Sequence, residues 1–355
     1  MTLPHPLLDL LGIRLPIIQA PMAGVSSPAM AAAVSDAGAL GSIGVGATDA
    51  DGARAMIAAV RERSTGPLNV NLFCHAPATA HRAVEAAWIE RLRPEFEALG
   101  ASPPSALNEI YRSFVEDDAM LTMLLEERPK VVSFHFGLPG EAALRALRGA
   151  GIVLLASATS LAEARTVAEG GIHAVVAQGW EAGGHRGVFD PDAPDDRLGA
   201  MALTRLLAHE IDLPVIAAGG IMDGAGIAAA LNLGAAAAQL GTAFVLSDES
   251  LADEGYRAAL ASDAANHTIM TRAISGRPAR GLTNRFTALG AKVPAEDVPA
   301  YPIAYDLGKA LHAAGKVRGE FGFGAQWAGQ AAPLARAMPA GQLVATLAAE
   351  LERAL

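Results

Sequence analysis

The segment Ala174–Gly187 combines an apolar strand pattern with a glycine-rich turn and one histidine. Its apolar run ends at Gln178, and Gly183 and Gly184 then precede His185. Glycines allow backbone N–H groups to approach a ligand closely, and a glutamine amide offers both donors and acceptors. His185 would follow the carboxyl end of a buried strand, where barrel enzymes place their chemistry. We predict His185 as the catalytic residue and Gln178 and Gly183 as cofactor contacts; the alternative is a tight turn with a surface histidine.

Two later apolar runs end in residues that suit phosphate binding. One is followed by a glycine pair, and the other ends in the sequence QLGT. In barrel enzymes the loops after the seventh and eighth strands commonly hold phosphate through backbone N–H groups. The predicted cofactor contacts in these two turns are Gly219, Gly220, Gln239, Leu240, Gly241 and Thr242. The alternative is a pair of ordinary tight turns.

Polar side chains also stand at the ends of other apolar runs. Gln19 and the following Pro21, Met22 and Ala23 end the first run, and Asn71 lies near the end of the third. Amides at buried strand ends are unfavourable unless a ligand or a polar network satisfies them. We predict that these residues form a platform for a planar, hydrogen-bonding ring whose phosphate lies over the last two strands, which describes FMN. The alternative is a structural amide network.

A second group of polar residues could bind a small anion. Tyr301, Tyr305 and Lys309 follow one another at intervals of four, which places them on one face of a helix. Two phenols and an ammonium group could line a substrate pocket. His135, at the end of the fourth run, could point into the same site beside His185. The alternatives are an ordinary amphipathic helix and a core histidine with its hydrogen bonds satisfied.

Eight apolar runs alternate with helical patterns, which predicts a (β/α)8 TIM barrel. A doubly wound open sheet is the competing architecture, but eight alternations in about 245 residues fit barrel closure better. The predicted strands are Pro16–Met22, Leu40–Gly44, Leu68–Phe73, Val131–Phe136, Ile152–Ala156, Ala174–Gly179, Pro214–Gly220 and Ala237–Phe244.

The alternation stops after Asp248. We predict an FMN-binding barrel over residues 1–250 with a helical insertion at about 76–128. A small substrate-capping domain would cover residues 251–320, and a C-terminal segment, 321–355, would pack back on the barrel. Within the cap, Ser275–Gly281 has the composition of a loop, and a helix is predicted to begin at Tyr301.

Composition limits the class of protein. Hydrophobic residues form 52% of the 355-residue chain and charged residues 18%, as in well-buried globular enzymes. A net charge of −10 argues against nucleic acid or an anionic membrane as a partner. No apolar stretch has the length of a membrane span, and no signal peptide is apparent. The single cysteine, Cys74, cannot form an internal disulfide, so we expect a cytoplasmic protein.

No metal site is expected. His173 and His185 flank the sixth predicted strand, and His75 and His81 lack a carboxylate companion in a known ligand pattern. The phosphate-loop, dinucleotide and nucleophile-elbow fingerprints are also missing.

These motifs together resemble the nitronate monooxygenases, formerly called 2-nitropropane dioxygenases. The resemblance covers nearly the whole chain and rests on Pro16–Met22 (PIIQAPM), Asn69–Phe73 (NVNLF), Ala177–His185 (AQGWEAGGH) and Ala217–Ile221 (AAGGI). The barrel motifs are shared with related FMN proteins. The segment with Tyr301, Tyr305 and Lys309 is similar to the class I bacterial group in particular.

The resemblance implies an FMN-dependent oxidation of alkyl nitronates by O₂ to a carbonyl product plus nitrite or nitrate. Propionate 3-nitronate is the implied substrate, and the implied route is one-electron transfer through a flavin semiquinone. His185 would be the catalytic residue, and His135, Tyr301, Tyr305 and Lys309 would form the substrate pocket. We expect a monomer or homodimer.

Two other functions remain open at this point. One is an NAD(P)H-dependent FMN quinone or enoyl reductase of the same barrel family. The other is a flavin-free phosphate-binding barrel, a lyase or isomerase that works through His185.

Overall fold

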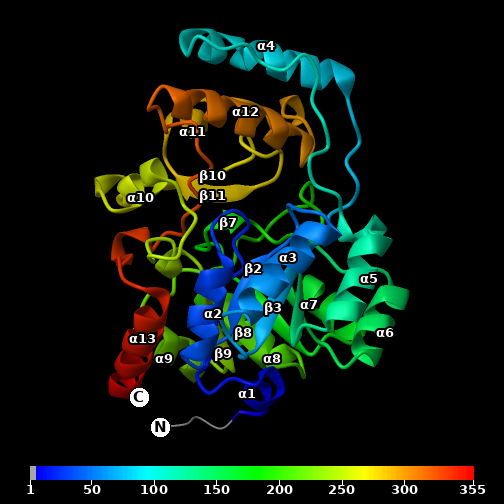
Figure 1. Cartoon of the computed structure of the whole chain (residues 1–355), viewed down its shortest axis with the longest axis vertical. Helices are drawn as coiled ribbons and strands as arrows, with labels where there is room; N and C mark the ends of the chain where they lie inside the picture. Colours follow the sequence, from blue (N-terminus) through cyan, green and yellow to red (C-terminus); the bar gives the residue numbers. More distant parts are fainter. Residues whose placement is uncertain (1–4) are drawn as a thin grey trace.

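The computed structural model describes residues 5–355, and its centre is a sheet of eight parallel strands rolled into a barrel (Figure 1). The strands follow the order β2, β3, β4, β5, β6, β8, β9, β1, and a parallel bridge between Ile18 and Leu40 brings the two edges together. They are β1 (Ile17–Gln19), β2 (Gly41–Gly44), β3 (Leu68–Phe73), β4 (Val131–His135), β5 (Val153–Ala158), β6 (Ala174–Gln178), β8 (Val215–Ala218) and β9 (Ala237–Leu240). Each lies within one of the eight predicted runs or overlaps it, so the predicted barrel is confirmed.

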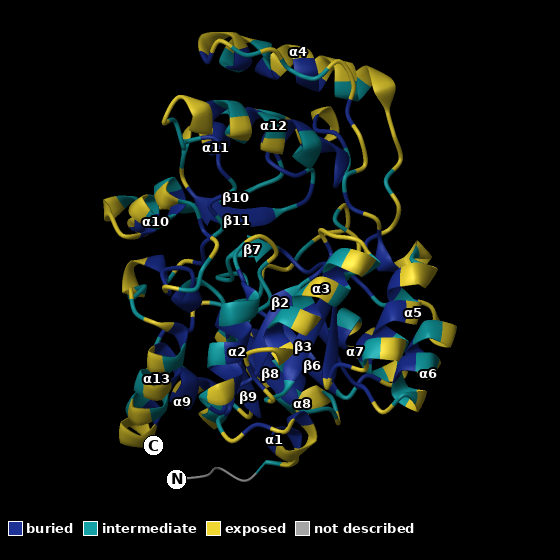
Figure 2. Cartoon of the chain, viewed as in Figure 1, coloured by how far each residue is buried: buried dark blue, intermediate teal, exposed yellow. Residues whose placement is uncertain are grey.

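Strand side chains alternate between the barrel interior and the surrounding helices. In β6, Ala174 and Val176 belong to the interior cluster, whereas Val175 and Ala177 pack beneath the helices. Three leucines of helix α1 (Pro6–Leu11) join the interior cluster and close the amino-terminal end of the barrel. Both faces of each strand are therefore buried, which explains why the strands are continuously apolar. Figure 2 shows the buried strands surrounded by helices with exposed outer faces.

Eight helices surround the strands. They are α2 (Pro28–Asp36), α3 (Ala50–Arg61), α5 (Asp118–Glu127), α6 (Glu141–Gly149), α7 (Leu161–Glu169), α8 (Ala200–Glu210), α9 (Gly224–Asn232) and α13 (Ala340–Ala354). Side-chain oxygens of Ser27, Asp49 and Ser160 accept backbone N–H groups of the first turns of α2, α3 and α7. Such caps satisfy donors that have no partner within the helix, and they fix where each helix begins.

The eighth barrel helix comes from the end of the chain. After β9 the chain leaves the barrel, and it returns as α13, which packs against α9 and α2. Leu343, Val344 and Leu347 of α13 are fully buried in this contact. Residues near the carboxyl terminus therefore complete the ring of helices.

The intervening residues lie over the carboxyl ends of the strands (Figure 1). They contain α10 (Glu254–Leu260), β10 (Thr268–Thr271), β11 (Ala279–Leu282), α11 (Arg285–Gly290) and α12 (Ile303–Val317). A small antiparallel sheet has the order β10, β11, β7, in which β7 is the pair Gly184–His185 that follows β6. Short 3-10 helices are η1 (Phe114–Glu116), η2 (Thr242–Phe244), η3 (Asp263–Asn266), η4 (Ala295–Asp297) and η5 (Ala332–Leu334).

The predicted insertion contains two parts with different neighbours. Helix α4 (Arg82–Ala98) packs against α12, above the barrel mouth in Figure 1. Helix α5 instead packs against α3 and α6, as the connection between β3 and β4. The first part therefore contributes to the cover of the mouth, and the second belongs to the ring of helices. Within residues 5–355 no helix is both long and apolar enough to cross a membrane.

Candidate active site

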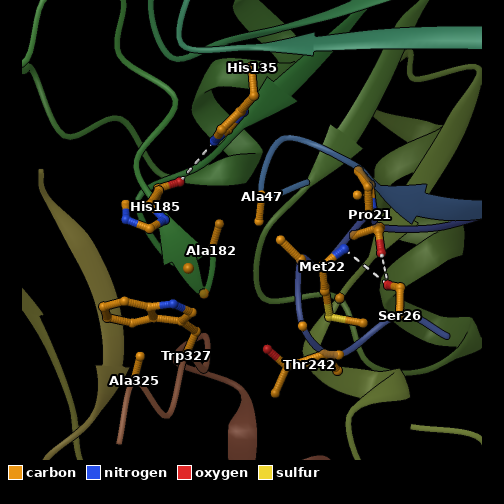
Figure 3. Close-up of a pocket in the computed structure, with 18 of the residues that line it drawn as sticks. Pro21, Met22, Ser26, Ala47, His135, Ala182, His185, Thr242, Ala325 and Trp327 are labelled. Atoms are coloured by element: carbon orange, nitrogen blue, oxygen red, sulfur yellow. Dashed lines mark hydrogen bonds between the residues drawn. The ribbon is translucent and has the colours of Figure 1, made fainter. Parts of the chain in front are cut away.

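A cavity of about 880 Å³ lies between the carboxyl ends of the barrel strands and the segments that cover them. Its volume is near the upper end of the range for small-molecule sites. Apart from Gln19 and Leu240, every residue predicted for the site lines this cavity (several appear in Figure 3): Pro21, Met22, Ala23, Asn71, His135, Gln178, Gly183, His185, Gly219, Gly220, Gln239, Gly241, Thr242, Tyr301, Tyr305 and Lys309.

Leu240 is one of the two exceptions, and Gln19 is described below. Its side chain is 1% exposed and packs in the core with Ile17 and Phe244. Successive side chains of a strand point to opposite faces, so Leu240 turns into the core while Gln239 and Gly241 border the cavity. The side chain of Leu240 is therefore not a cofactor contact.

His185 lies in an aromatic enclosure at the cavity wall. Its ring centroid is 5.3 Å from that of Tyr301, 5.3 Å from that of Trp327 and 5.7 Å from that of Phe136. Its Nε2 atom lies 2.9 Å from Oγ of Ser275. Burial lowers the pKa of His185 to about 3, and the neighbouring His135 adds to this effect. The imidazole is therefore neutral near pH 7.

His135 contacts His185 through the main chain. Its Nε2 atom lies 3.2 Å from the carbonyl oxygen of His185, and its Nδ1 atom lies 2.6 Å from Oγ of Ser157. Figure 3 shows the contact between the two histidines. Burial lowers the pKa of His135 to about 4, so this ring is also neutral. Both ring nitrogens of His135 are engaged within the protein, although the ring borders the cavity.

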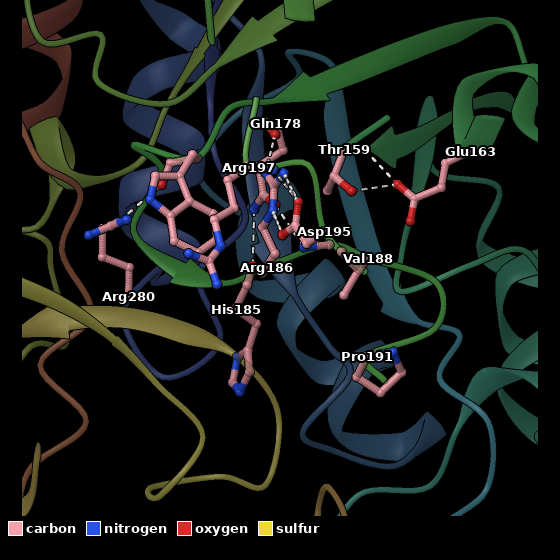
Figure 4. A network of polar contacts seen from close by, with 12 residues as sticks. Thr159, Glu163, Gln178, His185, Arg186, Val188, Pro191, Asp195, Arg197 and Arg280 are labelled. Atoms are coloured by element: carbon pink, nitrogen blue, oxygen red, sulfur yellow. Dashed lines mark hydrogen bonds and ion pairs between the residues drawn. The ribbon is translucent and has the colours of Figure 1, made fainter. Parts of the chain in front are cut away.

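The loop that carries His185 is held to β6 by polar contacts (Figure 4). Gln178 donates from Nε2 to the His185 carbonyl at 3.0 Å and accepts from the Gly187 N–H at 2.7 Å. Arg186 donates to the Gln178 carbonyl at 2.5 Å and forms a bidentate ion pair with Asp195. The side chain of Gln178 thus helps to build the loop, which leaves one donor and one acceptor position for a ligand.

The glycines of this loop differ in what surrounds them. A Cβ atom on Gly183 would lie 2.5 Å from the backbone nitrogen of Gly329, so close chain packing requires this glycine. Gly184 has a φ of +76°, which favours glycine, and no atom would lie within 4 Å of its Cβ. Gly184 is therefore the residue at which the turn borders open space.

Amides at the other strand ends fall into two groups. Asn71 donates to the Ser133 hydroxyl at 2.9 Å and to the Ser133 carbonyl at 3.2 Å, which leaves its Oδ1 as an acceptor at the cavity. Gln239 also borders the cavity. Gln19, in contrast, is fully buried and binds Ser26 and the backbone of Ser42. Its predicted place in the platform is wrong, and the interpretation as a structural amide network holds for this residue.

Unpartnered backbone donors gather at the ends of β8 and β9. The N–H groups of Gly219, Gly220 and Thr242 hydrogen bond to no other group of residues 5–355. Gly219 and Gly220 have φ values of +114° and +71°, a conformation that favours glycine. The Thr242 hydroxyl accepts the Gly329 N–H at 3.0 Å, so its own proton remains available. These donors fit a phosphate group.

The phenols of Tyr111, Tyr301 and Tyr305 and the ammonium group of Lys309 line one wall of the cavity. The Lys309 Nζ atom lies 5.0 Å from the ring centroid of Tyr111 and 5.5 Å from that of Tyr305. The nearby Asp306 carboxylate accepts hydrogen bonds from Asn108 rather than from Lys309. Burial raises the pKa of Tyr305 to about 12 and that of Tyr301 well above its usual value, so both phenols stay protonated. This wall can bind an anion through one charge and several neutral donors.

The predicted helix begins later than the spacing suggested. Helix α12 starts at Ile303, and Tyr301 precedes it. The residue before a proline is disfavoured in the α region, and Pro302 follows Tyr301. Tyr301 still reaches the cavity, together with Tyr305 and Lys309.

The prediction missed residues that complete the cavity wall. Tyr111 comes from the insertion, where no periodic pattern singled it out. Trp327 lies in the aromatic, glycine-rich stretch near the carboxyl terminus, and Tyr256 donates from its hydroxyl to the Trp327 carbonyl. The aromatic composition around Trp327 was the one available signal. Among the described residues, no cluster of three or more histidine, cysteine or acidic side chains could hold a metal ion.

The fold and the cavity define a (β/α)8-barrel enzyme that acts on a small ligand at the carboxyl ends of its strands. The chain belongs to the nitronate monooxygenase family, whose family model matches residues 5–350. It is therefore an oxidoreductase.

Named relatives agree with this assignment. The chain is 63% identical to a nitronate monooxygenase of Paraburkholderia phytofirmans over 349 residues, which cover 98% of this chain and 95% of the relative. It is 56% identical to a nitronate monooxygenase of Pseudomonas aeruginosa over 344 residues, 96% of this chain and 97% of the relative.

Solved structures support the same fold. The nitroalkane oxidase of Streptomyces ansochromogenes superposes with a TM-score of 0.90 at 42% identity, with 99% of each chain covered. FabK of Thermotoga maritima superposes with a TM-score of 0.75 at 29% identity, with 99% of this chain and 97% of that chain covered.

Proposed function

We propose that this enzyme uses FMN to oxidise small anionic nitronates, such as propionate 3-nitronate, with O₂. The observation that carries the proposal is one cavity with two complementary ends. Unpartnered donors of Gly219, Gly220 and Thr242 lie at one end, and the Lys309 ammonium group lies at the other wall. The first end suits a phosphate, and the second suits an anionic substrate.

The residues around the cavity fit FMN. Gly219, Gly220 and Thr242 would hold the phosphate through backbone N–H groups and a hydroxyl. The Oδ1 atom of Asn71, the Gln239 side-chain amide and the backbone near Met22 would contact the planar ring. When bound, FMN supplies the capacity to accept electrons from the substrate and to pass them to O₂.

The side chains of this chain would bind and orient the substrate. Lys309 would attract the anion, and the protonated Tyr301 and Tyr305 would donate hydrogen bonds to its oxygens. A nitronate is already an anion, so no proton has to be removed from it. For a neutral nitroalkane, His185 would have to act as the general base. Its imidazole is unprotonated and can accept a proton, but its lowered pKa makes this the harder task.

Residues 251–320 would act as a substrate cap. This segment supplies Tyr256, Tyr301, Tyr305 and Lys309 to the cavity wall, and Tyr111 of the insertion joins them. Exclusion of water by such a cover strengthens the attraction between Lys309 and a bound anion. A cytoplasmic location and a monomeric or homodimeric state complete the proposal.

An NAD(P)H-dependent FMN quinone or enoyl reductase is the second candidate function, because it would use the same FMN-binding residues and the same cavity histidine. Oxygen uptake with propionate 3-nitronate, measured beside NADH consumption with a quinone, separates the monooxygenase from the reductase. Fast uptake with negligible NADH oxidation is the expected result. NADH-driven quinone reduction without nitronate turnover would assign the reductase function. A purified protein that stays colourless after FMN is added would favour the flavin-free lyase or isomerase.

A further inference from the structure

The segment Ser275–Gly281 holds the histidine at the cavity wall. Its strand β11 pairs with β7, so that Ala279 lies opposite His185. The Arg186 N–H donates to the Pro278 carbonyl at 2.8 Å. Ser275 is fully buried, and its Oγ lies 2.9 Å from Nε2 of His185. A segment with the composition of a loop therefore contacts both the main chain and the ring of this residue.

The hydrogen-bond partners of Ser275 determine where its proton points. Its Oγ lies 3.2 Å from the carbonyl oxygen of Arg277, a group that can only accept. Within residues 5–355, the Ser275 hydroxyl is the one donor to this carbonyl. Buried carbonyls are rarely left without a donor, so the Ser275 proton is directed to Arg277. The Ser275 oxygen is then an acceptor, and His185 must donate to it from Nε2.

The pair formed by His135 and Ser157 has the opposite direction, which supports this reasoning. His135 must donate from Nε2, because the His185 carbonyl can only accept. Its Nδ1 then accepts the Ser157 proton at 2.6 Å. The Ser157 Oγ is also 3.3 Å from the Phe134 carbonyl oxygen. Phe134, however, lies in a strand that is paired on both sides, where backbone hydrogen bonds between strands can satisfy its carbonyl. Arg277 lies outside any strand and lacks that compensation.

We propose that Ser275 is a positioning residue that holds His185 in its Nε2–H tautomer, with the Nδ1 lone pair presented to the cavity. No group of residues 5–355 hydrogen bonds to Nδ1, and the residue lines the cavity. The charged and titratable groups around the ring are His75, His135 and Arg277, with the phenols of Tyr301 and Tyr305 toward the cavity.

The Nε2–H tautomer of His185 should affect nitroalkane turnover and nitronate turnover differently, an inference that rests on the proposed function. A neutral nitroalkane would lose its acidic C–H proton to Nδ1, while the electron pair of that bond is delocalised into the nitro group. The resulting imidazolium would keep donating from Nε2 to Ser275. A preformed nitronate needs no such base. Loss of the Ser275 hydroxyl should therefore impair nitroalkane turnover more than nitronate turnover.

The tautomer can be tested without turnover. Long-range ¹H–¹⁵N correlation spectra of histidine-labelled, FMN-loaded protein distinguish protonated from unprotonated ring nitrogens, and His185→Asn assigns the signals of His185. We expect a protonated Nε2 and an unprotonated Nδ1 in the native protein. In Ser275→Ala the Nδ1–H form should gain population, and Ser275→Thr should restore the native pattern. A native protein with Nδ1–H would overturn the proposal.

Kinetics provide the second test. Ser275→Ala should lower kcat/KM for nitroethane about tenfold, the effect of one neutral hydrogen bond, and change kcat/KM for the nitronate less than twofold. Ser247→Ala is the matched control, because Ser247 is equally buried and its Oγ has no hydrogen-bond partner among the described residues. Equal losses on both substrates, with native thermal stability, would contradict the base-presenting role. Failure of the native enzyme to oxidise either substrate would refute the proposed function but leave the spectroscopic result standing.

Discussion

The imidazole of His135 is hydrogen bonded to the main-chain carbonyl of His185, with 3.2 Å between Nε2 and the oxygen. The same carbonyl accepts from Gln178 at 3.0 Å. Two side chains, one at the end of β4 and one at the end of β6, thus fix the backbone from which the His185 ring projects. His135 was predicted as a substrate contact, but its ring nitrogens face protein groups.

We therefore expect His135→Gln to lower kcat for nitroethane about tenfold, the effect of one lost hydrogen bond on the placement of His185. The KM for nitroethane should change less than twofold. Steady-state oxygen uptake measures both quantities. His173→Gln is the control, because His173 also hydrogen bonds to the backbone, at Leu154, but outside the cavity. A large rise in KM with unchanged kcat would instead identify His135 as a substrate ligand.

Replacement of His185 itself should separate chemistry from cofactor binding. His185→Asn removes the base and the buried imidazole, and we expect kcat/KM for nitroethane to fall roughly 10²- to 10⁴-fold, the usual contribution of a general base. The FMN content of the purified variant should remain native, because the proposed phosphate-binding donors lie at the ends of β8 and β9. The flavin absorbance per protein checks this point. Unchanged kinetics in this variant would remove His185 from the mechanism.

The proposed anion-binding wall can be tested at Lys309. Lys309→Met should raise the KM for propionate 3-nitronate roughly tenfold to a hundredfold, because a hydrogen bond to a charged group contributes about 1.5–3 kcal/mol. The KM for neutral nitroethane should change little. Lys292→Met, at an exposed position, controls for the loss of one positive charge. An equal effect on both substrates would contradict a role in charge recognition.

The barrel could be predicted from the sequence because each strand is buried on both faces. Such strands appear as continuous apolar runs, and glycines or amides mark where they reach the cavity, as at Gln178 and Gly220. Residues from distant segments therefore met as predicted. His185 and Lys309 lie on the same cavity although 124 residues of sequence separate them.

Two features of the site could not be predicted from the apolar runs and the polar residues at their ends. A polar residue at the end of a strand can point toward the protein or toward a ligand, and the sequence does not distinguish the two. Gln19 was therefore placed in the site although it binds the backbone of Ser42. Gln178 was predicted only as a cofactor contact, but it also accepts a hydrogen bond from the Gly187 N–H. Tertiary contacts of irregular segments were also inaccessible. Tyr111 lies between α4 and η1 and contacts Tyr305, and Ser275 precedes β11 and contacts His185; neither contact is visible in the sequence.

The proposed phosphate-binding role of the turn after β8 predicts a specific loss of FMN. Gly220→Ala forces a side chain into a positive φ and places a Cβ atom 3.3 Å from that of Glu181, so the backbone donor should shift. We expect the Kd for FMN, from fluorescence titration of the apoprotein, to rise at least tenfold. Gly319→Ala is matched in strain, with a φ of +70° and open space around its Cβ, and lies outside the cavity. An equal Kd change in both variants would show that backbone strain alone is responsible.

Buried neutral histidines make stability depend on pH. Burial lowers the pKa of His75 to about 4, against about 6.5 in an unfolded chain. The unfolded state therefore binds more protons between these values, and the free energy of unfolding falls as pH decreases from 6.5 toward 4. His75 alone would contribute a loss of about 3 kcal/mol at pH 4.

His75→Phe, which preserves the edge-to-face contact with Tyr301, should flatten this pH dependence in urea titrations. His209→Phe, at the exposed surface, should keep the native slope; an unchanged slope in His75→Phe would mean that His75 does not contribute to it.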